Sequence, residues 1–64
     1  MPHKIRELIR DLERAGFINR GGRGDHRNFE HAKGIRVTLS GQRGDDAKPY
    51  QEHEVRQKIQ ESKQ

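Results

Sequence analysis

The chain contains no cysteine and no tryptophan, so neither a disulfide bond nor a Cys-ligated metal can support its fold. Hydrophobic residues are also scarce, at 27% of the 64 positions. A chain of this length has room for a single domain, 1–64, in which apolar burial barely offsets the conformational entropy that folding removes. We therefore expect a compact α/β core that gains further stability from a partner protein.

Long apolar segments are absent as well. No run of residues approaches the length of a membrane-spanning helix, and the N-terminal residues include no hydrophobic signal region. We expect a cytoplasmic protein that does not act at a membrane.

Positive charge is concentrated in the first two-thirds of the chain. Residues 4–43 contain ten Lys and Arg against five Asp and Glu, whereas residues 44–64 contain four against five, and the net charge is +4. This imbalance favours a polyanionic partner, and nucleic acid more than a membrane. Because charge that only keeps a small protein soluble gives the same balance, charge alone does not decide between these alternatives.

The first segment with helical spacing is 3–15, in which apolar residues recur at i, i+3, i+4 and i+7. Pro2 suits the start of this helix, and Gly16 suits its end because glycine readily adopts the left-handed conformation. The apolar stripe consists of Ile5, Leu8, Ile9 and Leu12.

A second helix is predicted over 50–62, where Val55 and Ile59 form a thin apolar stripe and Tyr50 lies near the start. The preceding residues, 40–49, include two glycines, a proline and two adjacent aspartates, a composition typical of a loop.

Three strands are predicted between the helices, over 17–20, 25–31 and 35–39. The glycine-rich residues 21–24 and a tight turn at 33–34 would join them as antiparallel neighbours. The predicted fold is α+β with the order α-β-β-β-α, a three-stranded antiparallel sheet with two helices on one face. This is the layout of the double-stranded-RNA-binding domain, an analogy that does not by itself assign a function.

Alternation along the second strand predicts which side chains face the helices. If Phe29 packs into the core, Arg27 and His31 share its side of the sheet. The opposite side is then open and carries residues that can transfer protons or bind phosphate and ribose hydroxyls. These residues are His26, Asn28, Glu30, Arg36 and Thr38.

His26 is the strongest candidate for a catalytic residue, because a histidine can act as a general base near neutral pH. RNA supplies its own nucleophile: loss of the 2′-hydroxyl proton lets that oxygen attack the adjacent phosphorus, with no metal or other cofactor. Asp25 is expected to point away from His26 and to cap the turn. The alternative is that His26 is an ordinary polar residue of the strand.

Cations and bare backbone amides close to His26 would stabilise the phosphate transition state. Arginines and glycines of the turn and hairpin are the candidates for this role, and polar residues of the open side could add contacts to RNA. The full set of candidate RNA-binding residues is Gly22, Arg23, Gly24, Arg27, Asn28, Arg36 and Thr38.

No metal site is predicted. No two histidines have metal-binding spacing, and His31, five residues after His26, should point to the other face of the same strand. The adjacent Asp45 and Asp46 could be the acidic pair of a two-metal nuclease, but two neighbouring acids in a loop far more often serve only solvation.

The order of helix, glycine-rich turn, Gly24-Asp25-His26, hairpin, loop and C-terminal helix resembles the HicA-like mRNA interferase toxins of bacterial toxin–antitoxin pairs, over about 4–59. The resemblance implies a ribosome-independent ribonuclease that cleaves mRNA and uses the histidine in catalysis. It also implies a cognate HicB-type antitoxin that binds over the active face. Asp25 stands where the family more often has serine, and the loop at 44–49 is longer and more acidic than is common.

Two other functional classes compete with this hypothesis. A non-catalytic RNA-binding module would bind RNA in a salt-dependent way without cleaving it. A pure interaction protein, whose positive charge serves an acidic partner, would fail to bind RNA even at low salt.

Overall fold

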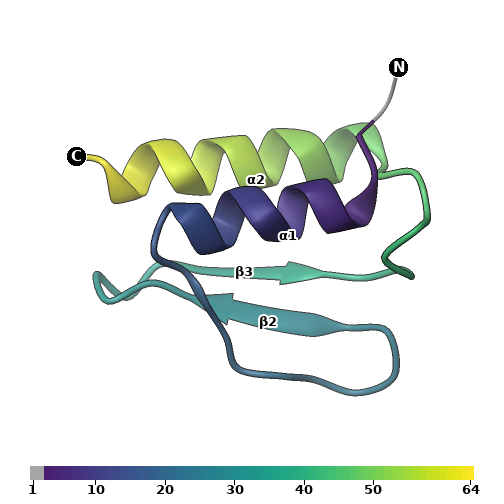
Figure 1. Cartoon of the computed structure of the whole chain (residues 1–64). Helices are drawn as coiled ribbons and strands as arrows, with labels where there is room; N and C mark the ends of the chain where they lie inside the picture. The colour runs from purple at the N-terminus through teal and green to yellow at the C-terminus, as the bar shows by residue number, and fades with distance from the viewer. Residues whose placement is uncertain (1–2) are drawn as a thin grey trace.

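The computed structural model describes residues 3–64, and Pro2 lies outside this range. Two helices lie side by side on one face of a three-stranded sheet, which confirms the predicted α-β-β-β-α order (Figure 1). In chain order the elements are α1 (Ile5–Arg14), β1 (Ile18–Asn19), β2 (Arg27–Glu30), β3 (Arg36–Leu39) and α2 (Pro49–Ser62).

The strands are antiparallel, in the order β1-β2-β3, and all three are shorter than predicted. Phe29 pairs with Val37 of β3 and with Asn19 of β1, which fixes the register. The prediction that β2 starts at residue 25 is wrong. The backbone N–H of His26 donates to the carbonyl of Arg23 at 3.0 Å and closes a turn, so the chain joins the sheet only at Arg27.

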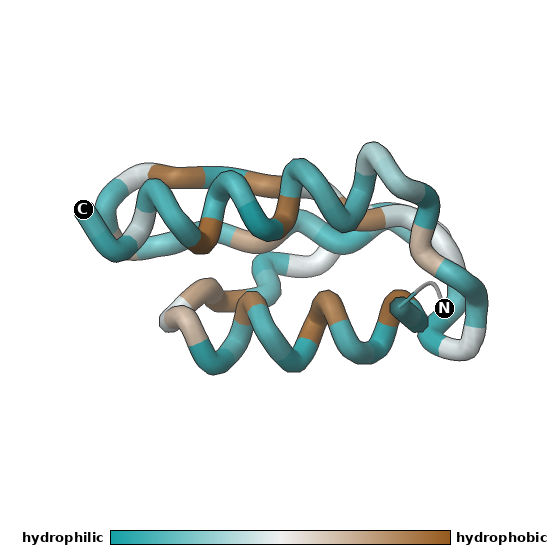
Figure 2. The backbone as a smooth tube through the Cα atoms, turned by 90° about the horizontal axis from the view of Figure 1, so that it is seen from above, coloured by the Kyte–Doolittle hydropathy of each residue, from teal (hydrophilic) through white to brown (hydrophobic). Residues whose placement is uncertain are grey.

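A single hydrophobic core fills the space between the helices and the sheet. The apolar residues of α1 recur about once per turn along the helix, as the spacing predicted (Figure 2). Both helices and the strands β2 and β3 contribute to the core, together with one residue just before β1 and one just before α2. Its buried members are Ile5, Leu8, Ile9, Leu12, Phe17, Phe29, Val37, Leu39, Ala47 and Val55.

The inner face of α2 differs from the prediction at its start. Tyr50 is 60% exposed, whereas Gln51 is buried and its Nε2 donates to the carbonyl of Ser40 at 3.0 Å. The helix begins at Pro49, which places Gln51 and Val55 one turn apart on the buried side and turns Tyr50 outward. A polar residue holds this position because its amide bonds the end of β3.

At the start of each helix, the side chain of the third helical residue accepts a hydrogen bond from the backbone N–H of the residue that precedes the helix. The backbone N–H of Lys4 donates to Glu7 at 2.7 Å, and that of Lys48 donates to Gln51 at 2.8 Å. The bond from Lys4 lowers the pKa of Glu7. Gly16, at φ +95°, follows α1 as predicted and turns the chain toward β1.

The two aspartates of the loop before α2 make local contacts. The Asp45 carboxylate accepts the backbone N–H of Gln42 at 3.0 Å, and Asp46 pairs with the side chain of Lys4. Both therefore fasten the loop at residues 40–48 to itself and to the start of α1. Over the described residues, no helix is long and apolar enough to cross a membrane.

Candidate active site

Residues 20–26 join β1 to β2, and we call them the 20–26 loop. The hydrogen-bonded pairing of β1 with β2 extends into the first residues of this loop, because the backbone N–H of Arg20 donates to the carbonyl of Asn28 at 2.7 Å. In return, the N–H of Asn28 donates to the carbonyl of Gly21 at 2.9 Å. The loop is exposed throughout its length. It is therefore anchored at its base and open to solvent at its tip.

Two positions of this loop require glycine, each for a different structural reason. A Cβ on Gly22 would lie 2.3 Å from the carbonyl oxygen of His26, a separation that no side chain tolerates. Gly24 has φ +60° and open space around it, so its conformation rather than its surroundings favours glycine. The loop thus passes directly over the His26 backbone, and both glycines are exposed to solvent.

His26 lies against Asp25, contrary to the prediction that these side chains point apart. The imidazole Nδ1 is 3.2 Å from a carboxylate oxygen of Asp25. The alternation that separates neighbouring side chains holds in a strand, but both residues lie in the turn before β2. The imidazole remains 62% exposed and is accessible to a ligand.

Arg27 lies on the helix-facing side of the sheet, as predicted, opposite Leu39 of β3. Its guanidinium is half-buried and donates to the carbonyl of Gly41 at 2.8 Å and to that of Asp25 at 3.4 Å. Arg27 therefore ties the end of the 20–26 loop to the loop at 40–48. These two bonds to carbonyl groups direct the side chain inward, away from the other candidate phosphate-binding residues.

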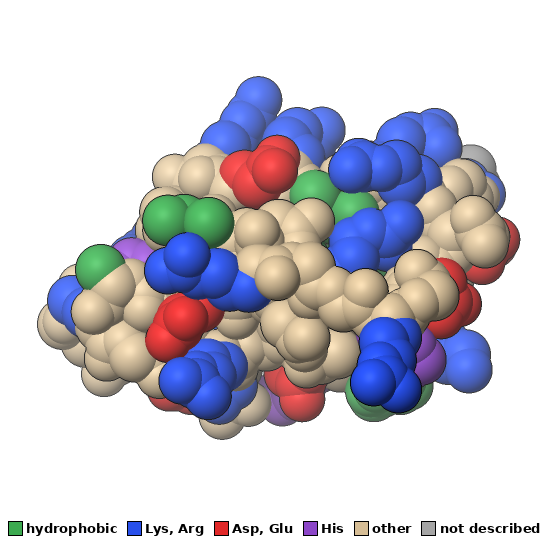
Figure 3. Space-filling model, turned by 90° about the horizontal axis from the view of Figure 1, so that it is seen from below, with side chains coloured by type: hydrophobic (Ala, Val, Ile, Leu, Met, Phe, Trp, Pro, Cys, Tyr) green, Lys and Arg blue, Asp and Glu red, His purple; other side chains and the backbone are tan. Residues whose placement is uncertain are grey.

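The side of the sheet opposite the helices is mostly polar, and we call it the open face; the exposed Ile18 is its one apolar member among the residues named below. Thr38 donates its hydroxyl to the side-chain oxygen of Asn28 at 2.8 Å. Glu30 lies 3.5 Å from the guanidinium of Arg20 and 3.3 Å from that of Arg36. Lys and Arg side chains are spread over this face with acidic groups between them (Figure 3). The open face consists of Ile18, Arg20, Asn28, Glu30, Arg36 and Thr38.

The structure therefore divides the predicted RNA-binding residues into three places. Gly22, Arg23 and Gly24 belong to the same loop as His26, and Arg27 lies on the helix side. Asn28, Arg36 and Thr38 share a shallow hollow of the open face. Sequence reasoning missed Arg20, which lines the same hollow; the signal was available, because the alternation of β1 continued by one residue places Arg20 beside Asn28.

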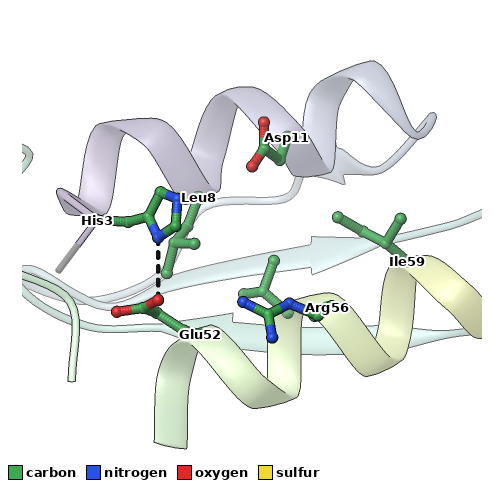
Figure 4. A pocket seen from close by; sticks show the side chains of 7 residues that line it. His3, Leu8, Asp11, Glu52, Arg56 and Ile59 are labelled. Atoms are coloured by element: carbon green, nitrogen blue, oxygen red, sulfur yellow. Dashed lines mark hydrogen bonds and ion pairs between the residues drawn. The ribbon is translucent and has the colours of Figure 1, made fainter. Parts of the chain in front are cut away.

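The other histidines serve elsewhere. His31 packs against Phe17 on the helix side of the sheet, with ring centroids 5.1 Å apart and the ring planes tilted by 58°. His3 faces Glu52 across the cleft between α1 and α2, with its Nδ1 2.9 Å from the carboxylate (Figure 4). This bond lowers the pKa of Glu52. Among residues 3–64 no three His, Asp or Glu side chains are grouped so that they could hold a metal ion.

Comparisons with known proteins add one positive result. The family model for the HicA toxin of bacterial toxin–antitoxin systems matches residues 5–60, from the start of α1 almost to the end of α2. A comparison with curated proteins gave no match. The matched segment includes the 20–26 loop and the whole open face.

Proposed function

The chain belongs to the HicA toxin family, and we propose that this toxin is a metal-independent endoribonuclease that cleaves mRNA with His26 as the general base. The observation that carries the proposal is the setting of His26. It is an exposed imidazole on a glycine-rich loop, directly before the strand that carries Asn28 of the open face. Such a position gives an extended RNA strand access to the ring.

In the proposed reaction, Nε2 of His26 takes the proton from a ribose 2′-hydroxyl. The freed oxygen attacks the adjacent phosphorus, and the bond from phosphorus to the 5′-oxygen of the next nucleotide breaks. The products are a 2′,3′-cyclic phosphate and a 5′-hydroxyl, the latter after the leaving oxygen gains a proton. A positioned base of this kind contributes roughly 10²- to 10⁴-fold to a rate.

Charge on the phosphate builds up in this transition state, and groups of the 20–26 loop are suited to stabilise it. Arg23 is exposed and its side chain has no ion-pair partner among the described residues. The backbone amides of the exposed Gly22 and Gly24 would add hydrogen-bond donors nearby. Arg27 would act from behind the loop, through its hold on the Asp25 carbonyl.

The open face would bind the RNA strand that leads into the reaction. Asn28 and Thr38 offer hydrogen-bonding groups to ribose or phosphate, and Arg36 offers a guanidinium that is 79% exposed despite its contact with Glu30. Within a toxin–antitoxin system, an antitoxin neutralises the toxin, and we propose a HicB-type protein that covers the open face and His26 together.

The test compares wild type, His26→Ala and His53→Ala on a labelled single-stranded RNA in EDTA. His53 is a matched control, because it is an exposed histidine on α2 with no hydrogen bond or ion pair in the described structure. We expect wild type and His53→Ala to produce 2′,3′-cyclic phosphate ends and His26→Ala to lose cleavage. Cleavage by His26→Ala at the wild-type rate would contradict the proposal.

A non-catalytic RNA-binding module is the second candidate, because the open face could bind a strand without His26. It predicts that all three proteins bind the RNA equally and that none cleaves it. The same assay, with binding measured by filter retention, separates the two functions.

A further inference from the structure

We propose that Asp25 is a positioning residue for His26, whose carboxylate holds the imidazole with the proton on Nδ1 and the lone pair on Nε2. For its catalytic consequence this inference rests on the proposed function. Its structural part, the choice of tautomer, stands independently of any activity.

The two side chains make an ion-pair contact whose angle in this structure is not that of a hydrogen bond, and once the two groups align this contact favours one tautomer. A carboxylate oxygen of Asp25 lies 3.2 Å from Nδ1 of His26. An ionised carboxylate only accepts hydrogen bonds, and a neutral imidazole carries a single N–H. The favourable arrangement is therefore a proton on Nδ1, which leaves Nε2 unprotonated and able to take a proton from substrate. Contacts of this kind tighten when a substrate binds.

The backbone around the pair is held from three sides. The N–H of His26 donates to Arg23, and the carbonyl of His26 lies beneath Gly22. The carbonyl of Asp25 accepts from Arg27, which also bonds Gly41 of the neighbouring loop. These contacts hold the backbone on either side of the pair, and in this structure the two side chains lie against each other.

The Asp25 carboxylate is not committed to another partner. Within residues 3–64 its only polar side-chain contact is the one to His26, and the side chain is 44% exposed. Asp45 and Asp46, by contrast, are bonded to the backbone of Gln42 and to Lys4. Among these three loop aspartates, Asp25 alone is available to a histidine.

The same carboxylate also suits the next stage of the reaction. When Nε2 takes the 2′-hydroxyl proton, the ring becomes a cation with N–H groups on both nitrogens. The negative charge of Asp25 then faces the protonated Nδ1 side and stabilises this imidazolium, while the protonated Nε2 side faces the phosphate. Asp25 takes no proton in this sequence.

The structural test is the tautomer of His26, read from long-range ¹H–¹⁵N NMR correlations at a pH where the ring is neutral. We expect the Nδ1–H form in wild type and a shift toward the Nε2–H form, which free imidazole side chains favour, in Asp25→Ala. An Nε2–H ring in wild type, or the same tautomer in both proteins, would overturn the proposal. Because this measurement needs no RNA, it is informative even where no cleavage occurs.

The kinetic test separates turnover from binding. We expect Asp25→Ala to lower kcat by about 10- to 100-fold, while the Kd for an uncleavable 2′-O-methyl RNA stays within about twofold of wild type. Asp25→Asn keeps an acceptor oxygen and loses the charge, so its kcat should lie between those of wild type and Asp25→Ala. Glu13→Ala, which removes an exposed carboxylate from α1, is the control for net charge and should match wild type.

Wild-type kcat in Asp25→Ala would contradict the positioning role. A parallel loss of RNA binding and thermal stability in Asp25→Ala would also contradict it, because it would assign the residue to the structure of the loop. If wild type itself does not cleave RNA, the proposed function fails, and the NMR result alone then decides the role of Asp25.

Discussion

The two sides of the sheet use the same short strands for different purposes. On the helix side, Phe29, Val37 and Leu39 are at most 4% exposed and belong to the core. On the open face, Asn28 and Thr38 alternate with them, face each other across the two strands and share one side-chain hydrogen bond. Packing holds the first set in place, whereas the second set is exposed to solvent. The core therefore depends on one side of this hairpin, and the proposed RNA contacts lie on the other.

The largest effect should come from the helix side. Phe29 is 1% exposed, and Phe29→Ala is expected to lower the free energy of unfolding by about 3–5 kcal/mol, enough to unfold a domain of this size. Thr38→Ala, on the open face of the adjacent strand, should change it by no more than about 0.5 kcal/mol. Urea denaturation followed by circular dichroism measures both. An equal loss of unfolding free energy in both variants would contradict the different roles of the two sides of the sheet.

The glycine-rich loop offers the next largest effect. Gly22→Ala forces a Cβ against the His26 carbonyl, so the loop must move and carry the imidazole with it. We expect cleavage to fall by about 10²-fold, the cost of a displacement on the order of 1 Å in a reacting group. Gly44→Ala is the control, because a Cβ there meets nothing within 4 Å. Equal cleavage by the two variants would contradict the close packing of the loop.

Acid should weaken the helical layer. The pKa of Glu7 is lowered by the Lys4 backbone N–H, and that of Glu52 is lowered by the His3 side chain. A carboxylate with a lower pKa in the folded chain stabilises the fold above its unfolded pKa, and this stabilisation is lost as pH falls through the folded pKa.

We therefore expect the free energy of unfolding to decrease from about pH 5 downward, and Glu52→Gln to flatten that decrease. Glu13→Gln serves as the control, because the side chain of Glu13 has no partner among residues 3–64. The measurement is urea denaturation at a series of pH values. A Glu52→Gln curve parallel to that of wild type would show that the bond to His3 has no energetic role.

The smallest effect concerns single phosphate contacts. If Arg23 binds one phosphate, Arg23→Gln should reduce the slope of log K against log salt by about 0.7 for single-stranded RNA. Arg14→Gln, at the end of α1, removes the same charge from a surface with no proposed contact and should leave the slope unchanged. Binding of 2′-O-methyl RNA over a range of salt concentrations gives both values. Equal salt slopes in the two variants would show that Arg23 does not contact a phosphate of the bound RNA.

The sequence predicted the packed parts of the molecule better than the site. The apolar spacing of α1 and the alternation around Phe29 placed the core side chains correctly, because burial imposes those periods. The same alternation failed at Asp25 and His26, where hydrogen bonds within the turn override it. The glycines predicted a turn with unusual backbone angles. The contact between the Asp25 and His26 side chains depends on the three-dimensional shape of that turn, which the spacing of residues in the sequence does not determine.

The proposed reaction depends on the 2′-hydroxyl of the substrate, so RNA that lacks this hydroxyl should resist cleavage. Purified wild type would be given two labelled RNAs of one sequence in EDTA, one natural and one with a 2′-O-methyl group on every ribose. We expect both to bind and only the natural RNA to be cleaved, with 2′,3′-cyclic phosphate ends, because His26 has no proton to remove from the methylated strand. Cleavage of the 2′-O-methyl RNA would contradict the account, since it would require another nucleophile than the 2′-oxygen that His26 is proposed to activate.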